Sequence, residues 1–165
     1  MMGATTLRIE PVAFADAAAQ ALVADVQAEY TVLYGGPDDT PLEDGVFDPP
    51  AGAFFLGYDE QGTAVAMGGW RRRPDVSPWG LQPAAEIKRM YVVRAARRRG
   101  FARAVLDHLE RTAAEAGAAV MVLETGTMQP EAIEMYTRAG YQGIDAYGHY
   151  AWSPSSRYFG KPLSR

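Results

Sequence analysis

Six consecutive apolar residues, 118–123, constrain the fold more than any other segment of this chain. A strand that is apolar at every position has to be covered on both faces, as the strands of parallel sheets are. Residues 99–116, just before it, carry apolar side chains at helical spacing. A strand-like run, 85–93, precedes that helix. The sequence therefore predicts a strand–helix–strand crossover unit with two parallel strands.

The other segments predict further strands and helices around this unit. The expected strands are 6–12, a hairpin of 53–58 with 63–72, and two closing strands at 141–146 and 157–163. Helices are expected at 16–34 and at 130–139, the second opened by Pro130 and ended by Gly140. Residues 35–50 form a loop in this prediction. The fold class is thus α/β, with no second domain, so residues 1–165 are expected to form one domain.

Composition excludes several kinds of chemistry. The 165 residues contain no Cys, which removes disulfides, thiolate metal sites and a Cys nucleophile, and only two His, too few for a His-rich zinc site. No apolar run reaches the length of a membrane span, and the first ten residues do not resemble a signal peptide. We therefore expect a cytoplasmic protein without a metal or a membrane partner.

Charge is distributed unevenly along the chain. The net charge is −4, yet residues 1–70 hold eleven acids and a single base, Arg8, whereas residues 86–103 hold seven bases and a single acid, Glu86. Two ligands of opposite sign would suit such a molecule, although a solvated basic face and an acidic loop explain the pattern equally well. The acidic N-terminal half disfavours RNA binding through the arginine clusters at 71–73 and 97–99, which remains a weaker alternative.

The turn at residues 97–102, Arg-Arg-Arg-Gly-Phe-Ala, joins the strand 85–93 to the helix that follows. A helix that starts directly after a strand exposes unpaired N–H groups and the positive end of its dipole, which together attract anions. Gly100 and Ala102 would let phosphate oxygens approach the main chain, and the arginines add charge. Neither a dinucleotide fingerprint nor a P-loop is present, so the sequence predicts a phosphate-bearing ligand other than NAD or ATP.

Here the sequence resembles the GNAT superfamily of acetyl-CoA dependent N-acetyltransferases. Arg97-x-x-Gly100-x-Ala102 matches that family's pyrophosphate motif [Q/R]-x-x-G-x-[G/A]. The resemblance continues in residues 86–92 before the motif, in residues 123–126, and in residues 132–141, which are similar to the family's late helix. One departure is that the chain contains no Asn where many relatives have a cofactor-contacting Asn; residues 129–131 are Gln-Pro-Glu instead.

The resemblance implies a GNAT-like fold: a mixed, mostly antiparallel sheet flanked by helices, with a bulged central strand splayed from its parallel neighbour. It also implies that main-chain groups of the central strand hold the pantetheine arm of acetyl-CoA and that amides after it wrap the pyrophosphate. The cofactor-binding residues expected on this basis are Met90, Tyr91, Val92, Arg97, Arg98, Arg99, Gly100, Phe101, Ala102 and Arg103.

Acetyl transfer to an amine needs a group that removes a proton from the amine. Glu86, on the strand beside the cofactor, is the first candidate base, and the structural alternative is an ion pair with Lys88 or Arg89. Tyr136 in the late helix is the candidate acid, since relatives often use a Tyr there, and the alternative is a core Tyr. Glu124 and a water chain remain open as other bases. His149 is expected to be solvated and His108 structural.

We therefore expect a cytoplasmic N-acetyltransferase that moves an acetyl group from acetyl-CoA directly to a primary amine of a small molecule or peptide. A non-catalytic acyl-CoA sensor is the alternative function, and a homodimer is left open. The acids of the loop 35–50, with the aromatic residues Tyr30, Tyr34 and Phe47 near it, favour an acceptor with extra positive charge. Solvation of a mobile loop explains these acids equally well.

Overall fold

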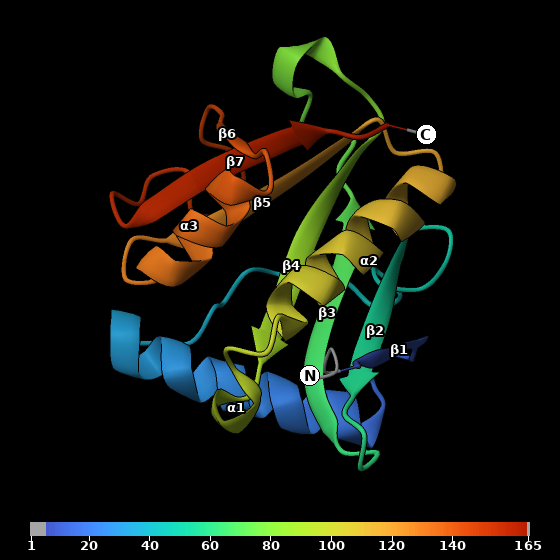
Figure 1. Ribbon diagram of the computed structural model, residues 1–165. Helices are drawn as coiled ribbons and strands as arrows, with labels where there is room; N and C mark the ends of the chain where they lie inside the picture. Colours follow the sequence, from blue (N-terminus) through green and yellow to red (C-terminus); the bar gives the residue numbers. More distant parts are fainter. Residues whose placement is uncertain (1–5, 165) are drawn as a thin grey trace.

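The computed structural model describes residues 6–164. Seven strands form one sheet in the order β1-β2-β3-β4-β5-β7-β6, in which only β4 and β5 run parallel (Figure 1). In chain order the elements are β1 (Arg8–Pro11), α1 (Ala17–Tyr34), β2 (Gly52–Tyr58), β3 (Ala64–Arg72), η1 (Pro78–Gly80), β4 (Ala84–Val92), η2 (Arg94–Ala96), α2 (Phe101–Glu115), β5 (Val120–Gly126), α3 (Pro130–Arg138), β6 (Gln142–Gly143) and β7 (Ser156–Pro162).

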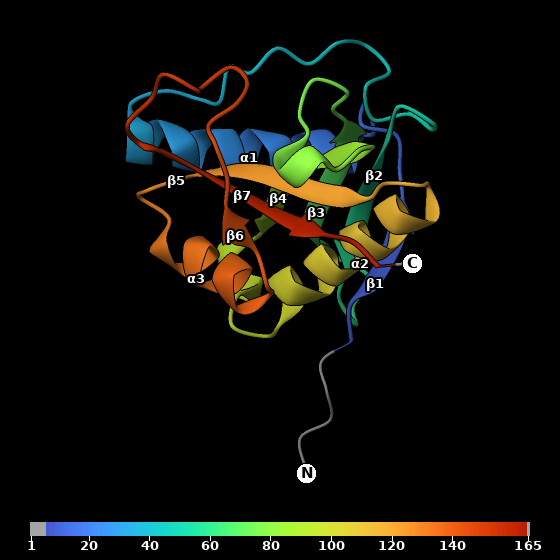
Figure 2. The same ribbon diagram turned by 90° about the horizontal axis from the view of Figure 1, so that it is seen from above.

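Helices cover both faces of the sheet. Figure 2 shows α1 on one face, and α2 and α3 on the other. The larger core lies on the α2 side, where Val105, Leu106 and Leu109 are almost completely buried against the sheet. A smaller core lies under α1, around Leu22 and Val26. Burial on both sides explains the continuous apolar sequence of β5.

The parallel strands β4 and β5 separate after three paired positions. Ala84, Ala85 and Glu86 pair with Val120, Met121 and Val122, and beyond Glu86 the two strands diverge, as Figure 1 shows. The diverging ends, Ile87–Val92 and Leu123–Gly126, are called the fork below. Strand β4 also has a bulge opposite Gly68, where Arg89 adopts a left-handed φ of 58°. The expected splayed and bulged central strand is therefore confirmed.

The predicted mixed α/β sheet and its crossover are confirmed, and most boundaries agree within three residues. The first closing strand is much shorter than predicted, because only Gln142 and Gly143 pair with β7. After Ile144 the chain leaves the sheet and places the Tyr147 ring 5.3 Å from the Tyr158 ring. Packing of this aromatic pair overrides the strand propensity of residues 144–146.

Candidate active site

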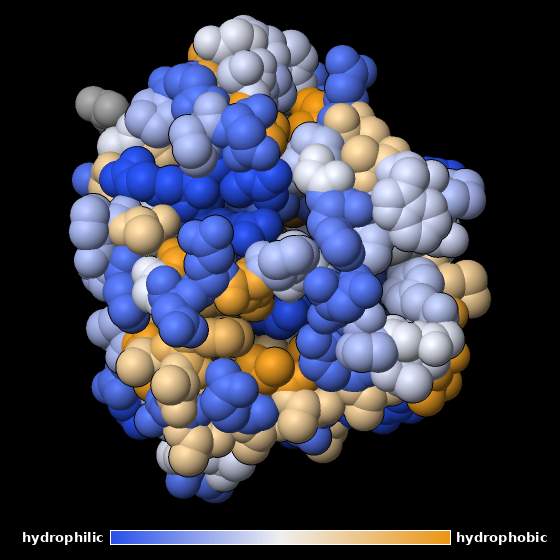
Figure 3. Space-filling model, turned by 180° about the vertical axis from the view of Figure 1, so that it is seen from behind, coloured by the Kyte–Doolittle hydropathy of each residue, from blue (hydrophilic) through white to orange (hydrophobic). Residues whose placement is uncertain are grey.

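A polar cleft lies at the fork, on the sheet face opposite α2. Glu86 and Lys88 of β4 line it together with Glu124 of β5, whereas Ile87 and Leu123 point to the core on the other face. Figure 3 shows hydrophilic side chains gathered around a hollow on this side of the molecule. The remaining lining residues are Thr40, Arg71, Arg73, Tyr147, Gly148, His149 and Tyr150.

Glu86 is buried at the closed end of the fork, where it is only 3% exposed. Its Oε1 accepts hydrogen bonds from Arg71 Nε at 2.8 Å and from Arg73 Nη1 at 2.9 Å. Burial raises the pKa of this carboxyl, but the charges of Lys88, Arg73 and Arg71 outweigh burial and hold the pKa below its ordinary value. Glu86 is thus a firmly ionised group paired with two arginines of β3 and the segment after it, not with Lys88 or Arg89.

Glu124 has the opposite character. It lies two residues beyond Val122 on β5, mostly buried, and no ion pair to its carboxylate occurs among residues 6–164. Burial raises its pKa, and the charges of Asp38 and Glu86 add to this, so that the pKa reaches about 7 despite the opposing charge of Lys88. A carboxyl group with this pKa can both accept and release a proton near neutral pH.

Asp38 connects the loop after α1 to the fork. Gln27 of α1 fixes its backbone with two hydrogen bonds, of 3.0 and 2.8 Å. The Asp38 carboxylate accepts hydrogen bonds from Lys88, Arg89 and Thr40. Burial raises its pKa, but the charges of Lys88 and Arg89 prevail and lower it strongly. Asp38 is therefore an anion already saturated by its own chain.

The carboxylate of Asp39, the next acid of this loop, also has partners within the chain. Asp39 Oδ1 lies 2.9 Å from His149 Nε2 and accepts a 2.6 Å hydrogen bond from the Tyr150 hydroxyl. These contacts join the loop after α1 to the loop before β7, across the cleft. Phe47, expected near the acceptor, is instead buried in the core beside Phe54, because its ring packs 5.3 Å from that ring.

The turn before α2 has the geometry of an anion site. Arg98 and Gly100 both adopt left-handed φ values, of 65° and 80°, and no side chain of the described residues caps the first turn of α2. A β-carbon at Gly100 would meet no atom of residues 6–164 within 4 Å, so space for a ligand lies next to it. Phosphate groups bind to such exposed N-terminal N–H groups, so these residues fit the pyrophosphate of a coenzyme.

Arg97 of the same turn is directed inward. Its Nε donates to the Val92 carbonyl oxygen at 2.9 Å, and its Nη2 lies 3.0 Å from both carboxylate oxygens of Glu29 on α1. The first residue of the motif thus holds the turn against β4 and α1, although part of its side chain is exposed, as Arg98 and Arg99 also are.

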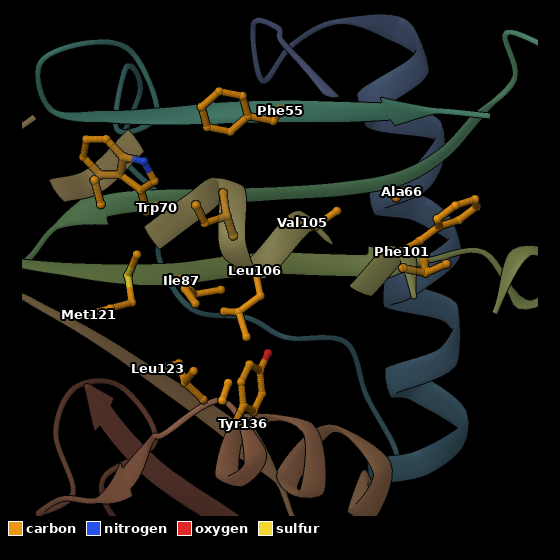
Figure 4. Packing of buried hydrophobic residues seen from close by; sticks show 14 of the residues in the cluster. Phe55, Ala66, Trp70, Ile87, Phe101, Val105, Leu106, Met121, Leu123 and Tyr136 are labelled. Atoms are coloured by element: carbon orange, nitrogen blue, oxygen red, sulfur yellow. The ribbon is translucent and has the colours of Figure 1, made fainter. Parts of the chain in front are cut away.

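Tyr136 points from α3 into the core on the α2 side, toward Leu106 (Figure 4). Its ring packs 5.6 Å from that of Tyr141, and its hydroxyl makes no hydrogen bond in the described part of the chain. Burial raises its pKa strongly, with smaller contributions from Tyr30 and Glu124. The Tyr136 hydroxyl therefore carries its proton at neutral pH.

The end of α1 is attached to the loop after β5. The Tyr34 hydroxyl accepts a hydrogen bond from the Met128 N–H at 3.2 Å and donates to Gln129 Oε1 at 3.3 Å. Its ring lies so close to Gly126 that a β-carbon there would collide with it. Gln129, the first residue of the Gln-Pro-Glu segment, therefore contacts α1.

Sequence reasoning missed the partners of the acidic groups. The sequence indicates only that Arg71 and Arg73 are basic, and it offers Lys88 and Arg89 only as partners for Glu86. One signal was available: Glu86 and Lys88 alternate with apolar residues in β4, so they share one face of a strand. The contacts of Asp38, 50 residues away from Lys88, have no such signature.

Comparison with known proteins defines the class to which this fold and site belong. Residues 19–141 match the acetyltransferase (GNAT) family, and the chain is a member of that family. A segment of 78 residues, 47% of the chain, is 36% identical to the IAA acetyltransferase of Azospirillum brasilense, and the match spans about half (51%) of that relative's length.

Solved structures agree with this membership. A proposed acyl-CoA N-acyltransferase of Klebsiella pneumoniae is 29% identical, with a TM-score of 0.79 over 96% of this chain and 98% of that one. A GNAT acetyltransferase of Staphylococcus aureus Mu50 is 15% identical, with a TM-score of 0.70 over 96% and 100%, and shares the fold. No helix within residues 6–164 combines the length and apolar character needed to cross a membrane.

Proposed function

We propose that this protein transfers the acetyl group of acetyl-CoA to a primary amine of a small molecule or peptide, directly and without an acetyl-enzyme. The fork carries this proposal, because it joins an anion-binding turn on the α2 side to a polar cleft on the other side, whose Glu124 has no ion pair within residues 6–164. The family membership and the name of the Azospirillum relative support acetyl transfer. A cytoplasmic location and a single-domain organisation remain part of this proposal.

The residues assigned to the donor are those of the turn and of the end of β4. The N–H groups of residues 98–103 would hold the pyrophosphate, and the main chain of Met90, Tyr91 and Val92 would hold the pantetheine arm. When bound there, acetyl-CoA supplies an acetyl group activated as a thioester. The inward side chain of Arg97 keeps the turn in place through Glu29 and Val92.

We assign the general base to Glu124 and a supporting role to Glu86. A base has to be partly unprotonated at neutral pH yet basic enough to take a proton from an amine, and a pKa of about 7 meets both conditions. Glu86 binds a proton only weakly, because two arginines stabilise its ionised form. Its fixed charge contributes instead to raising the pKa of Glu124.

Tyr136 is the proposed acid. Its hydroxyl, free of hydrogen bonds within residues 6–164, would donate its proton at Oη to the departing thiolate on the α2 side of the fork. For a neutral amine, Glu124 takes one proton on one face and Tyr136 gives one on the other, so this step conserves protons. An amine that arrives protonated first releases one further proton to solvent.

The experiment compares Gly100→Asp with Gly62→Asp. Both glycines have nearly the same positive φ, 80° and 79°, and neither β-carbon would meet an atom within 4 Å, so the two changes cost similar backbone strain. Only Gly100→Asp places a carboxylate against the pyrophosphate site. We expect calorimetry to show at least about a hundredfold weaker acetyl-CoA binding for Gly100→Asp alone, because two like charges would meet there. Equal affinities would refute the donor site.

A second measurement separates an enzyme from an acyl-CoA sensor. Thiol release from acetyl-CoA is followed with a panel of primary amines and with no amine. Amine-dependent release supports transfer. Tight acetyl-CoA binding with no thiol release for any amine supports the sensor. A sensor would not need a proton-accepting carboxyl such as Glu124 at the fork.

A further inference from the structure

Lys88 and Glu124 occupy equivalent places on the two arms of the fork. Each lies two residues beyond the last parallel pair, Glu86 with Val122, and the side chains of both line the same cleft. Strand positions two residues apart point to the same face. The ammonium and the carboxyl therefore face each other across the opening.

These two groups have opposite charge but do not touch. No ion pair of 4.0 Å or less joins them in the described chain, although Lys88 is the largest charged contributor to the pKa of Glu124. Within residues 6–164, Lys88 Nζ makes one hydrogen bond, a 3.3 Å contact with Asp38 Oδ2, although an ammonium has three donors. Its side chain is only 10% exposed, so water satisfies the other donors poorly.

The bulge in β4 adds a second cation to the Lys88 arm. Consecutive strand residues normally point to opposite faces, but the left-handed φ of Arg89 lets both Lys88 and Arg89 reach Asp38 Oδ2. The Arg89 side chain is 5% exposed, and its buried Nε has no hydrogen-bond partner among the described residues. Two cations thus share one carboxylate, and a buried donor is left unpaired, which is rare in proteins.

The cationic hydrogen-bond donors of the cleft consequently outnumber the anionic acceptors that are still free to bind a ligand. Asp38, Asp39 and Glu86 are occupied by partners from the chain itself, so none of them is free to bind a cationic ligand. Glu124 is the one carboxyl of the cleft without an ion pair in residues 6–164. A ligand that matches this arrangement brings one anionic group to the Lys88 arm and one amine to the Glu124 arm.

Resting on the proposed acetyl transfer, we propose that the acceptor is an amine that carries a carboxylate near its amino group, an amino acid or a close analogue, whose carboxylate binds Lys88 and whose amine faces Glu124. This assignment is opposite to the polycationic acceptor suggested by the acidic loop in the sequence. It makes Lys88 a specificity-determining residue.

The test uses three matched sets of ligands: L-amino acids, their carboxamides, which lack the negative charge, and the amines that remain after loss of the carboxylate. Binding to the full chain is measured by saturation-transfer NMR in the presence of CoA, and transfer is measured by thiol release from acetyl-CoA. We expect at least one amino acid to bind about tenfold or more tightly than its carboxamide, the size of a charge-assisted hydrogen bond.

Substitutions of Lys88 test whether this residue causes the preference for an amino acid over its carboxamide. Lys88→Met should abolish the difference between acid and carboxamide, whereas Lys88→Arg, which keeps the charge, should preserve it. Lys161→Met is the matched control, because Lys161 is the other lysine of the sequence and forms an ion pair with Glu110 away from the cleft. If Lys88→Met does not fold, Lys88→Gln, which also removes the charge, takes its place and should abolish the difference in the same way.

Each outcome has one meaning. The proposal of an amino-acid acceptor would be overturned if carboxamides or simple amines bound as well as the amino acids, or if no amino acid bound. The proposed acetyl transfer would still stand in that case if thiol were released. Amino acids that bind with Lys88-dependent preference but release no thiol would support the binding site and overturn the proposed transfer.

Discussion

Replacing Glu124 by Gln tests the chemistry of the fork most directly, because the change removes the proton-binding group and little else. The carboxyl has a pKa of about 7 in the folded protein and an ordinary value of 4.5. In the wild type the rate should rise as pH increases through 7, since the base must lose its proton to act. Glu124→Gln should lower kcat by about a hundredfold to ten-thousandfold and remove this inflection.

The same pKa predicts an effect on stability. Between pH 4.5 and 7 the folded wild type holds a proton at Glu124 that the unfolded chain has lost, so its free energy of unfolding falls as pH rises through this window. A pKa displaced from 4.5 to about 7 corresponds to at most about 3 kcal/mol. Glu124→Gln should match the wild type near pH 4 and exceed its stability at pH 8 by up to that amount.

Urea unfolding at a series of pH values measures this difference, and the rate profile is recorded with a responsive amine. Glu86→Gln serves as a comparison, because its loss should reduce stability at neutral pH but keep an inflection in the rate. If Glu124→Gln retains the wild-type rate profile and shows no gain in stability between pH 5 and 8, the assigned base and its raised pKa are both refuted.

Two further perturbations concern groups around the fork. Tyr136→Phe should leave acetyl-CoA affinity within about twofold, because its hydroxyl has no hydrogen bond in residues 6–164, yet lower kcat by about a hundredfold to ten-thousandfold; an unchanged kcat would make it an ordinary core residue. Asp38→Asn should lose about 1–3 kcal/mol of stability at pH 7. Since the folded pKa of Asp38 is depressed, its contribution is present above about pH 4 and disappears as pH falls below that value, so urea unfolding should give a smaller difference near pH 2.

Local patterns in the sequence predict most of the architecture. The apolar run at 118–123 requires a strand covered on both faces, and Gly140, with φ of 96°, ends α3 as expected. The turn at Gly100 is equally local, because its features lie within six residues. The short β6 could not be predicted, since the packing of Tyr147 on Tyr158 depends on residues brought together only by the fold.

The roles of the carboxyl groups depend on contacts that the sequence does not record. Glu86 and Glu124 are both strand residues near the cofactor, and nothing local distinguishes them. Two arginines from β3 and the segment after it pair with Glu86, whereas the divergence of β4 from β5 leaves Glu124 without an ion pair within residues 6–164. The ionisation state of each group is therefore a property of the three-dimensional arrangement.

Helix α1 contacts both the proposed donor site and the polar cleft proposed for the acceptor. Glu29 binds Arg97 of the phosphate turn, Gln27 fixes Asp38 above the cleft, and Tyr34 is attached to the loop after β5. A shift of this helix on binding one ligand would therefore change the geometry offered to the other. If acetyl-CoA changes the affinity for the acceptor by some factor, thermodynamic reciprocity requires that the acceptor changes the affinity for acetyl-CoA by the same factor. Helix α1 is the rigid body through which such cooperativity between the two substrates would pass.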